Sequence, residues 1–299
     1  MNGQKDFLYR GILESEDTRL SYAVCTETVN TAVLRHGCDP LSAHLLCRAL
    51  GAGVLAAPLL GPGETYTLRW EYEGAAKTVM VVVDADCQIR GFVANPEMLS
   101  CVDGEESVYG SGGRVTVVKG DADGCTLNTG TCEAALLDVV EDFAYFLCVS
   151  DQTETGMVVM VGFRQDPEAP VALCQGLMVQ ALPGCDPERF DIVRGRLGSS
   201  EVRALLSAPP RNDNHLELIA RALAGNTDTL EPLRLAASPS PRFQCQCTHE
   251  RMRDVLAVAG ATELRDMVEK REPVVVSCRF CSSRHTFDLE EIGELLAEI

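Results

Sequence analysis

Four cysteines near the end of this chain constrain its fold more than any other feature. Residues 245–281 begin with the pair Cys245-Gln-Cys247 and end with the pair Cys278-Arg-Phe-Cys281, with thirty residues between the pairs. Two close pairs of thiolates separated by a folded excursion can converge into a tetrahedral site, the geometry that Zn²⁺ takes from four cysteines. The spacing therefore predicts a small fold built around one metal ion.

The residues between the two pairs supply the rest of such a fold. Met252, Leu256 and Leu264 can form the small core that brings the pairs together. His249 and His285 lie near the pairs and are alternative ligands, but four cysteines already complete a tetrahedral set. We interpret both histidines as surface or supporting groups.

A four-cysteine site has two functional interpretations at this point. It can be an ordinary zinc ribbon that only holds a small domain together. It can also be a redox sensor, because the two sulfurs of each pair are near enough to form a local disulfide that removes metal donors without long-range rearrangement. A Cys-x-Cys disulfide closes a tight ring, and strained disulfides are the reducible, regulatory kind.

The chain has fourteen cysteines, and the ten others lack metal-ligand spacing. With 299 residues the chain can bury a core without disulfides, and its start, MNGQKDFLYRG, does not resemble a secretory signal. We therefore expect a cytoplasmic protein whose scattered cysteines are mostly small buried apolar groups that the redox switch does not need. These ten are Cys25, Cys38, Cys47, Cys87, Cys101, Cys125, Cys132, Cys148, Cys174 and Cys185.

The charge and hydropathy of the chain exclude two classes of partner. Residues 241–299 hold 11 acidic and 8 basic side chains, which leaves 33 and 18 of the totals of 44 and 26 for residues 1–240, a net charge of −15 there. So acidic a body repels phosphate backbones, and we expect no nucleic acid partner. The longest apolar stretch, residues 40–60, is interrupted by His44 and Arg48, so we expect a buried core helix and no membrane partner.

Strand and helix patterns follow one another without regular βαβ alternation, which predicts an α+β fold. Thr26 is a candidate cap for a helix ending near Gly37, and Asp39 with Pro40 opens the next helix. A hairpin is expected from the alternating residues 66–72 followed by 79–83. The remaining expected elements of the body are strands at 17–26, 115–118, 157–163 and 177–182, and a helix at 133–147.

The character of the chain changes at Asp186, where short helices begin. Two of them carry single narrow apolar stripes, and the last is expected from about Asn214 to Ala224. Helices this short are marginal in water unless they pack on something, so this segment is expected to be conditionally stable. The stripes are Phe190, Val193 and Leu197, and Leu216, Ile219 and Leu223. The expected domains are a 1–184 N-terminal α+β body, a 185–238 helical linker and a 239–299 C-terminal zinc-binding domain.

The last part of the chain contains Phe243, Cys245, Cys247, Glu250 and Arg251, followed by Cys278, Phe280 and Cys281. This series resembles the C-terminal signature of one family, the redox-regulated thirty-three-kilodalton heat-shock chaperone of bacteria, also called the thirty-three-kilodalton chaperonin. Motifs of the body also resemble the family. They are Arg90-Gly91 with Asn95-Pro96-Glu97, Tyr145-Phe146 with Ser150-Asp151-Gln152, and Gly176 to Gly184. Thr248, Asp151 and His285 depart from the usual residues, and none of these changes removes a ligand.

The resemblance implies an ATP-independent holdase that is inactive while reduced and bound to one Zn²⁺ per chain. Under peroxide or hypochlorous-type oxidants, Cys245 pairs with Cys247 and Cys278 with Cys281. The metal is lost, the linker unfolds, and apolar surface becomes available to unfolding client proteins. Oxidised family members are homodimers and pass clients to the ATP-driven seventy-kilodalton chaperone system.

Two rival functions are less consistent with the sequence. A thiol-disulfide oxidoreductase would use Cys278 and Cys281 at the start of a helix in a βαβ unit, which this chain lacks, and it would not need a second pair upstream. A zinc-ribbon nucleic-acid module conflicts with the acidic charge. Neither a phosphate loop nor a nucleophile elbow is complete, so we expect no enzymatic activity.

Overall fold

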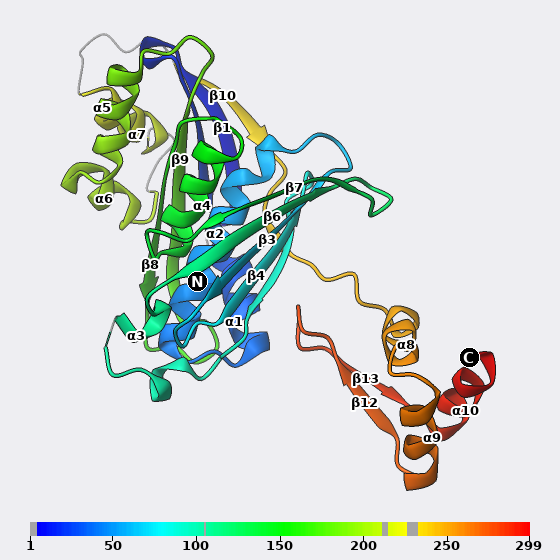
Figure 1. Ribbon diagram of the computed structural model, residues 1–299. Helices are drawn as coiled ribbons and strands as arrows, with labels where there is room; N and C mark the ends of the chain where they lie inside the picture. The colour runs from blue at the N-terminus through cyan, green and yellow to red at the C-terminus, as the bar shows by residue number, and fades with distance from the viewer. Residues whose placement is uncertain (1–4, 105, 211–214, 226–232) are drawn as a thin grey trace. The chain divides into compact units, whose positions relative to one another are not determined.

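The computed structural model describes residues 5–104, 106–210, 215–225 and 233–299. It divides into two compact units, Met1–Phe243 and Gln244–Ile299, and Figure 1 shows the elements of each. Both units combine helices and strands, which confirms the predicted α+β class. The domain boundaries after residues 184 and 238 remain a prediction.

The first unit contains a five-stranded antiparallel sheet with the order β10-β1-β2-β9-β8. A short 3₁₀ turn, Glu14–Glu16, joins β1 to β2. Apolar residues alternate along β1, while β2 and β9 are buried almost throughout, as central strands covered on both faces are. The strands are β1 (Phe7–Leu13), β2 (Thr18–Val24), β8 (Thr155–Phe163), β9 (Val171–Ala181) and β10 (Arg234–Ser238).

A six-stranded sheet with the order β11-β5-β4-β3-β6-β7 completes the strands of this unit. The predicted hairpin is confirmed, because β3 and β4 pair antiparallel from Thr65 opposite Asp84 to Glu71 opposite Thr78. Two short helices, η3 (Met98–Cys101) and α3 (Glu106–Tyr109), lie between β5 and β6. The strands are β3 (Thr65–Tyr72), β4 (Thr78–Asp84), β5 (Gln88–Val93), β6 (Gly113–Gly120), β7 (Thr126–Glu133) and β11 (Arg242–Phe243).

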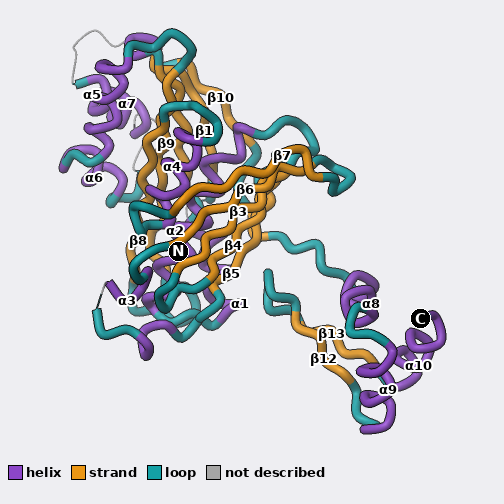
Figure 2. The backbone as a smooth tube through the Cα atoms, viewed as in Figure 1, coloured by secondary structure: helices purple, strands orange, loops and turns teal. Residues whose placement is uncertain are grey.

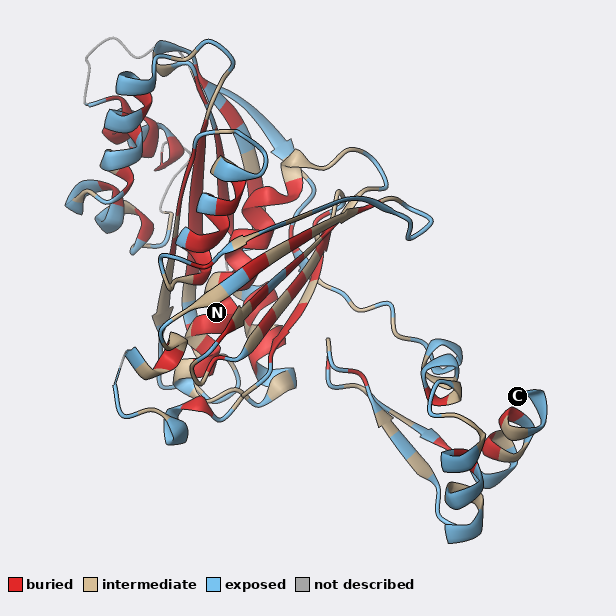
Figure 3. Cartoon of the chain, viewed as in Figure 1, coloured by how far each residue is buried: buried red, intermediate tan, exposed pale blue. Residues whose placement is uncertain are grey.

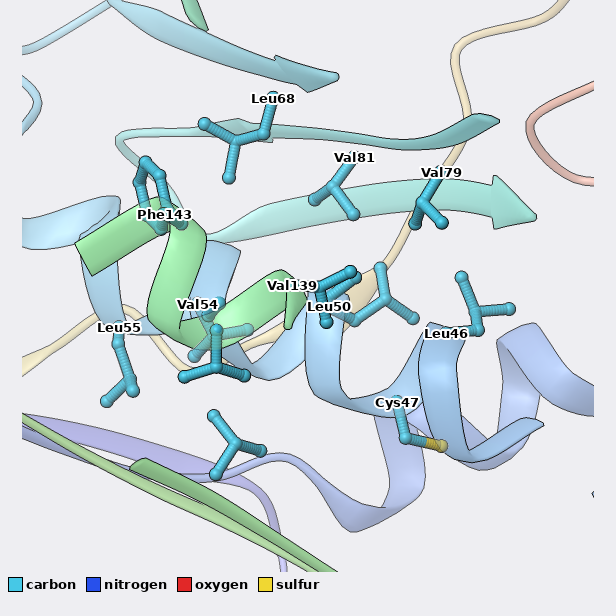
Figure 4. Close-up of a cluster of buried hydrophobic side chains, with 14 of the residues drawn as sticks. Leu46, Cys47, Leu50, Val54, Leu55, Leu68, Val79, Val81, Val139 and Phe143 are labelled. Carbon is cyan, nitrogen blue, oxygen red and sulfur yellow. The ribbon is translucent and has the colours of Figure 1, made fainter. Parts of the chain in front are cut away.

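The main core lies between the two sheets and is organised by α2 (Pro40–Ala56), which packs on strands of both. Asp39 caps this helix by accepting a hydrogen bond from the Ser42 amide at 2.8 Å, with Pro40 in the first turn, as predicted. Figure 4 shows its apolar side chains among those of β3, β4 and α4. The stretch Pro40–Leu59, which ends in the turn η2 (Ala57–Leu59), is long and apolar enough to cross a membrane, but most of it is buried inside the fold, as in a core helix.

Two helices differ from their sequence-based expectations. α1 (Thr26–His36) is capped by Asp6, whose carboxylate accepts hydrogen bonds from the Glu27 and Thr28 amides, so Thr26 is not its cap. α4 spans Val139–Val149 and does not begin at residue 133, because Glu133 pairs with Arg114 at the end of β7. Asp138 caps α4 through the amides of residues 140 and 141.

Three short helices cover the other face of the five-stranded sheet. They are α5 (Pro187–Leu197), α6 (Ser200–Leu206) and α7 (His215–Ala224). Asn214, the predicted start of α7, lies outside the described residues. In sequence these helices follow β9 and precede β10, so both flanking strands belong to the sheet that the helices cover. Figure 3 shows each helix with a buried and an exposed side.

The second unit is a hairpin with three helices, drawn with its strands and helices distinguished in Figure 2. The buried side chains of Leu256, Leu264, Phe287, Ile292 and Leu295 form its core, with Met252 partly buried beside them. The predicted contribution of Met252, Leu256 and Leu264 is therefore confirmed. The elements are α8 (His249–Ala257), α9 (Ala261–Lys270), β12 (Val274–Ser277), β13 (Arg284–Phe287) and α10 (Leu289–Glu298).

Candidate metal centre

Two irregular segments of the second unit carry the four clustered cysteines. Cys245 and Cys247 lie in the extended segment before α8, and Cys278 and Cys281 lie in the turn between β12 and β13. The turn is fixed by two backbone hydrogen bonds, from the Cys278 amide to the Ser283 carbonyl at 2.9 Å and from the Ser282 amide to the Cys278 carbonyl at 2.8 Å. The hairpin thus holds the second pair rigidly.

The sulfur atoms of the two segments converge on one point. All four Sγ atoms lie within 4.8 Å of one another. The Cys245 Sγ is 3.7 Å from the Cys278 Sγ, and the Cys247 Sγ is 3.3 Å from the Cys281 Sγ. The structure thus brings together all four residues that the sequence singled out, over a separation of more than thirty residues.

These dimensions match a tetrahedral metal site. With metal–sulfur bonds of about 2.3 Å, the sulfurs of a tetrahedron lie about 3.8 Å apart. Four sulfur donors without an oxygen donor suit Zn²⁺ and other thiophilic metals and not Mg²⁺ or Ca²⁺. Cys278 and Cys281 are buried and the first pair is half-buried, so the group can hold a metal ion while one side remains open to small reagents.

The four thiols do not have equal acidity. Burial raises the pKa of Cys245 and of Cys247. Burial also acts to raise the pKa of Cys281, but hydrogen bonds with the Ser283 hydroxyl, at 3.2 Å, and with the backbone outweigh it and lower this pKa to about 7. Close packing of four sulfurs without a cation disfavours several thiolates at once, because like charges repel. A bound cation removes that repulsion.

The two histidines near the pairs do not join the sulfur cluster. The only group of metal-binding side chains found within the described residues consists of the four cysteines. His249 instead contacts the Glu291 carboxylate at 2.7 Å and stacks on Phe287 with ring centroids 4.3 Å apart. His285 lies 6.2 Å from the His249 ring. The first histidine thus links α8 to the hairpin and to α10.

One contributor to the site was not expected from the sequence. Ser283 provides both the carbonyl that fixes the Cys278 turn and the hydroxyl that contacts the Cys281 sulfur. The signal available in the sequence was a small polar residue two positions beyond the last cysteine, which is too common to be informative. Only the closed turn gives it a role.

A second candidate functional feature is the sheet face under α5–α7, which we call the helix-covered face. It is formed by Leu13, Leu20, Tyr22, Val24, Leu177 and Val179 of the five-stranded sheet. The predicted stripe residues of α5 and α7 are buried against it. It is therefore a large apolar surface whose only cover, among the described residues, is three helices of seven to eleven residues.

Few polar contacts hold this cover in place. The Gln175 side chain of β9 accepts a hydrogen bond from the Tyr22 hydroxyl and donates one to the Ala208 carbonyl at 2.7 Å, just beyond α6. Arg196 of α5 donates to the Leu223 carbonyl of α7 at 2.7 Å. The Arg194–Glu154 ion pair is exposed and therefore weak. Apolar burial supplies most of the docking free energy.

Comparison with known proteins identifies the class. The family model described as Hsp33 protein matches residues 6–288. Proteins named 33 kDa chaperonin are similar over nearly the whole chain: 30% identical in Citrifermentans bemidjiense, over 98% of both chains, and 30% identical in Geobacter sulfurreducens, over 97% of this chain and 94% of the relative. A crystal structure of the 33 kDa chaperonin from Thermotoga maritima, 24% identical, shares the fold with a TM-score of 0.82 over 99% of both chains.

The fold, the thiol group and these matches together define a chaperone with a four-cysteine group able to bind a metal ion. The chain belongs to the Hsp33 family. The expectation that it has no enzymatic activity remains a prediction.

Proposed function

We propose that this chaperone is a redox-regulated, ATP-independent holdase. In the reduced state the four-cysteine group binds zinc and the protein is inactive. In the oxidised state the second unit unfolds, α5–α7 leave the helix-covered face, and this face binds unfolding client proteins. The observation that carries the proposal is the convergence of the four sulfurs in a unit with a very small core.

Cys245, Cys247, Cys278 and Cys281 would hold one Zn²⁺ per chain as thiolates. The ion, when bound, supplies the positive charge that stabilises four neighbouring thiolates and cross-links the two segments that carry them. Structural zinc contributes on the order of 10–16 kcal/mol to the folding of small peptide sites at neutral pH. The core of the second unit has five buried side chains, so its fold depends on this contribution.

Oxidation removes the donors. One thiolate of a pair attacks peroxide, which gives a sulfenic acid and releases one water, and the second thiol attacks the sulfenic sulfur, which forms the disulfide and releases another water. Two thiols thus lose two electrons and two protons, and one peroxide becomes two waters. Two peroxides convert all four thiols to Cys245–Cys247 and Cys278–Cys281.

Chain connectivity favours these local pairs. In the folded site, sulfurs of different segments are also in contact. Once the unit loosens, the segments separate, whereas cysteines one or two positions apart remain close because the loop between them is short. Both disulfides are therefore expected to be local once the unit has loosened.

Unfolding of the second unit reaches α7 along the chain. Cys245 follows β11, which pairs with β5 through two residues only, and β10 is an exposed edge strand between β11 and α7. When residues from 244 onward are unfolded, β11 and then β10 are expected to separate more easily from their neighbouring strands. The short helices then lose their fixed C-terminal anchor, and helices of this length do not persist without packing.

The same proposal includes the partners and compartment expected of the family. The oxidised form is a homodimer, because a large exposed apolar face favours self-association, and it hands clients to an ATP-driven seventy-kilodalton chaperone. We place the protein in the cytoplasm, in keeping with fourteen free cysteines, ten of them outside the metal site.

Light scattering of a thermolabile client enzyme tests the proposal. Reduced protein should leave aggregation unchanged, and peroxide-treated protein should suppress it at a stoichiometric ratio without ATP. A chromophoric chelator should record the release of one zinc per chain with the same time course, and sedimentation should report the dimer.

The matched control is Cys125→Ser, which removes an exposed thiol of the first unit and should switch normally. Equal activity of the reduced and oxidised forms would contradict the proposal. Loss of zinc without gain of activity would indicate a structural ribbon, and catalytic turnover of a disulfide substrate would indicate an oxidoreductase.

A further inference from the structure

Two cysteines in the core of the first unit are in direct contact. The Sγ atoms of Cys25 and Cys174 are 3.4 Å apart, and both residues are fully buried in the core between the two sheets. Cys25 is the first residue after β2, at the start of α1, and Cys174 lies in β9; the Cys25 amide donates a hydrogen bond to the Cys174 carbonyl at 3.0 Å. This contact joins residues 149 positions apart and is independent of the proposed metal switch.

The backbone at this pair is suited to a disulfide. The β2–β9 ladder ends with Val24 opposite Gln175, and the hydrogen bond from the Cys25 amide to the Cys174 carbonyl extends the backbone contact one residue beyond it. Directly opposed residues of antiparallel strands have Cα atoms about 4.5–5.5 Å apart, which is within the range of about 4.4–6.8 Å found for disulfides. The two sulfurs are already in contact, so they need only a small further approach to form the bond.

Another buried thiol of this core, that of Cys47, has no comparable sulfur–sulfur contact with Cys174. The Cys174 sulfur lies 3.8 Å from the backbone carbonyl oxygen of Cys47, in α2. The structure thus presents a pair with defined partners and not an undirected group of thiols.

In the folded protein the pair is protected. The hydrogen bond to Cys174 and burial raise the pKa of Cys25. The same hydrogen bond acts to lower the pKa of Cys174, but burial together with the nearby Cys47 thiol and Asp6 carboxyl raises it overall. Thiols react with peroxide as thiolates, and no solvent reaches either sulfur. Oxidation therefore requires that the core of the first unit opens first.

We infer that Cys25 and Cys174 form a second, conditional disulfide, closed by peroxide only when the first unit begins to open. One thiolate attacks peroxide to give a sulfenic acid and water, and the other thiol displaces a second water as the S–S bond forms. The bond would join the end of β2 to the neighbouring strand β9. Because these residues are far apart in the sequence, it would close a loop that contains more than half of the first unit. It would restrict unfolding of that unit when oxidant and heat act together.

Non-reducing peptide mapping of the full-length protein tests this inference. After peroxide at 25 °C, where the first unit is folded, the Leu20–Arg35 tryptic peptide should remain unlinked while the four thiols of the second unit are oxidised. After peroxide at the onset of thermal unfolding, it should be found joined to the peptide of residues 165–189. The midpoint of thermal unfolding of the first unit should then rise by several degrees, and a reductant should reverse the shift.

Variants assign the bond. The peptide of residues 165–189 contains Cys174 and Cys185, so Cys174→Ala should abolish the link and Cys185→Ala should retain it. Cys47→Ala is the matched control for a buried thiol of the same core. Absence of the link in wild-type protein under oxidant and heat would overturn the inference, as would its formation in the folded protein as fast as the disulfides of the second unit.

Discussion

At the scale of single residues, the four sulfurs are not interchangeable with other polar atoms. A serine hydroxyl at one position keeps the size of the side chain but is not a thiolate at neutral pH and binds zinc poorly. Cys245→Ser or Cys278→Ser should therefore reduce bound metal from one ion per chain to well below stoichiometric. Metal analysis of protein purified with a reductant measures this directly.

His249→Ala and His285→Ala are the controls for the ligand set, and both should retain one metal ion. His249 stacks on Phe287 and contacts Glu291, so its replacement should lower the thermal stability of the second unit without loss of metal. Full metal content in the cysteine variants together with its loss in a histidine variant would refute the assignment.

Residue types were predictable where spacing along the chain carries the information. The two cysteine pairs can be recognised as metal ligands because the members of each pair are one or two positions apart in the sequence. The contact of Cys25 with Cys174 was not predictable, since it depends on the register of β2 with β9, and single cysteines in apolar strands resemble any small core residue. Asp6 could not be recognised as the cap of α1 from the sequence. The strands β1 and β2 separate it from the helix, and only their pairing brings its carboxylate to the first amides of α1.

At the scale of secondary-structure elements, α7 contains a group that makes its docking depend on pH. His215 is buried near Tyr22, and its Nε2 has no hydrogen-bond partner. Burial lowers the pKa of His215 below its ordinary value of 6.5, although a hydrogen bond with the Leu205 backbone opposes this. A released α7 exposes the ring to water, where its pKa returns to about 6.5.

Docking of α7 should therefore weaken on acidification. Above about pH 6.5 the ring is neutral in both states and docking is at its strongest, and as the pH falls from there towards the lower pKa of the docked state, only the released state gains a proton. Hydrogen exchange of α7 in reduced protein, corrected for intrinsic rates, should be faster at pH 5.5 than at pH 7.5. His215→Gln should remove this difference and His36→Gln, on α1, should not; an unchanged difference in His215→Gln would contradict the role of this residue.

Elements were predicted best where local capping and alternation decide them. Asp39 and Pro40 mark the start of α2, and the alternating residues of β3 and β4 mark the hairpin. The helix expected from residue 133 begins later because residues 126–133 form a strand, β7, that pairs with β6. The pairing of β10 with β1, far apart in the sequence, had no local signal.

At the scale of the whole molecule, oxidation should unfold one unit and part of the other. Hydrogen exchange of oxidised, metal-free protein should show loss of protection in α5, α6, α7 and residues 244–299, because each depends on support that oxidation removes. β4, in the middle of the six-stranded sheet, should remain protected. The reduced, metal-bound protein is the reference.

The pattern of protection separates this mechanism from its alternatives. A fully active oxidised form with protected α5–α7 would show that clients bind elsewhere. Loss of protection in β4 as well would indicate global unfolding and not a switch. A Cys125→Ser protein should give the same pattern as the unaltered chain.

The segment that carries α5–α7 stays joined to the five-stranded sheet through β9, which lies inside the sheet, even where the edge strand β10 frays. After release these helices cannot diffuse away, so they act as an intramolecular competitor at an effective concentration of about millimolar for the face they leave. A client must bind more tightly than this competitor to be retained. Under the proposed function, renewed reduction of the thiols would restore the docking of these helices, which would favour release of the client to the seventy-kilodalton chaperone.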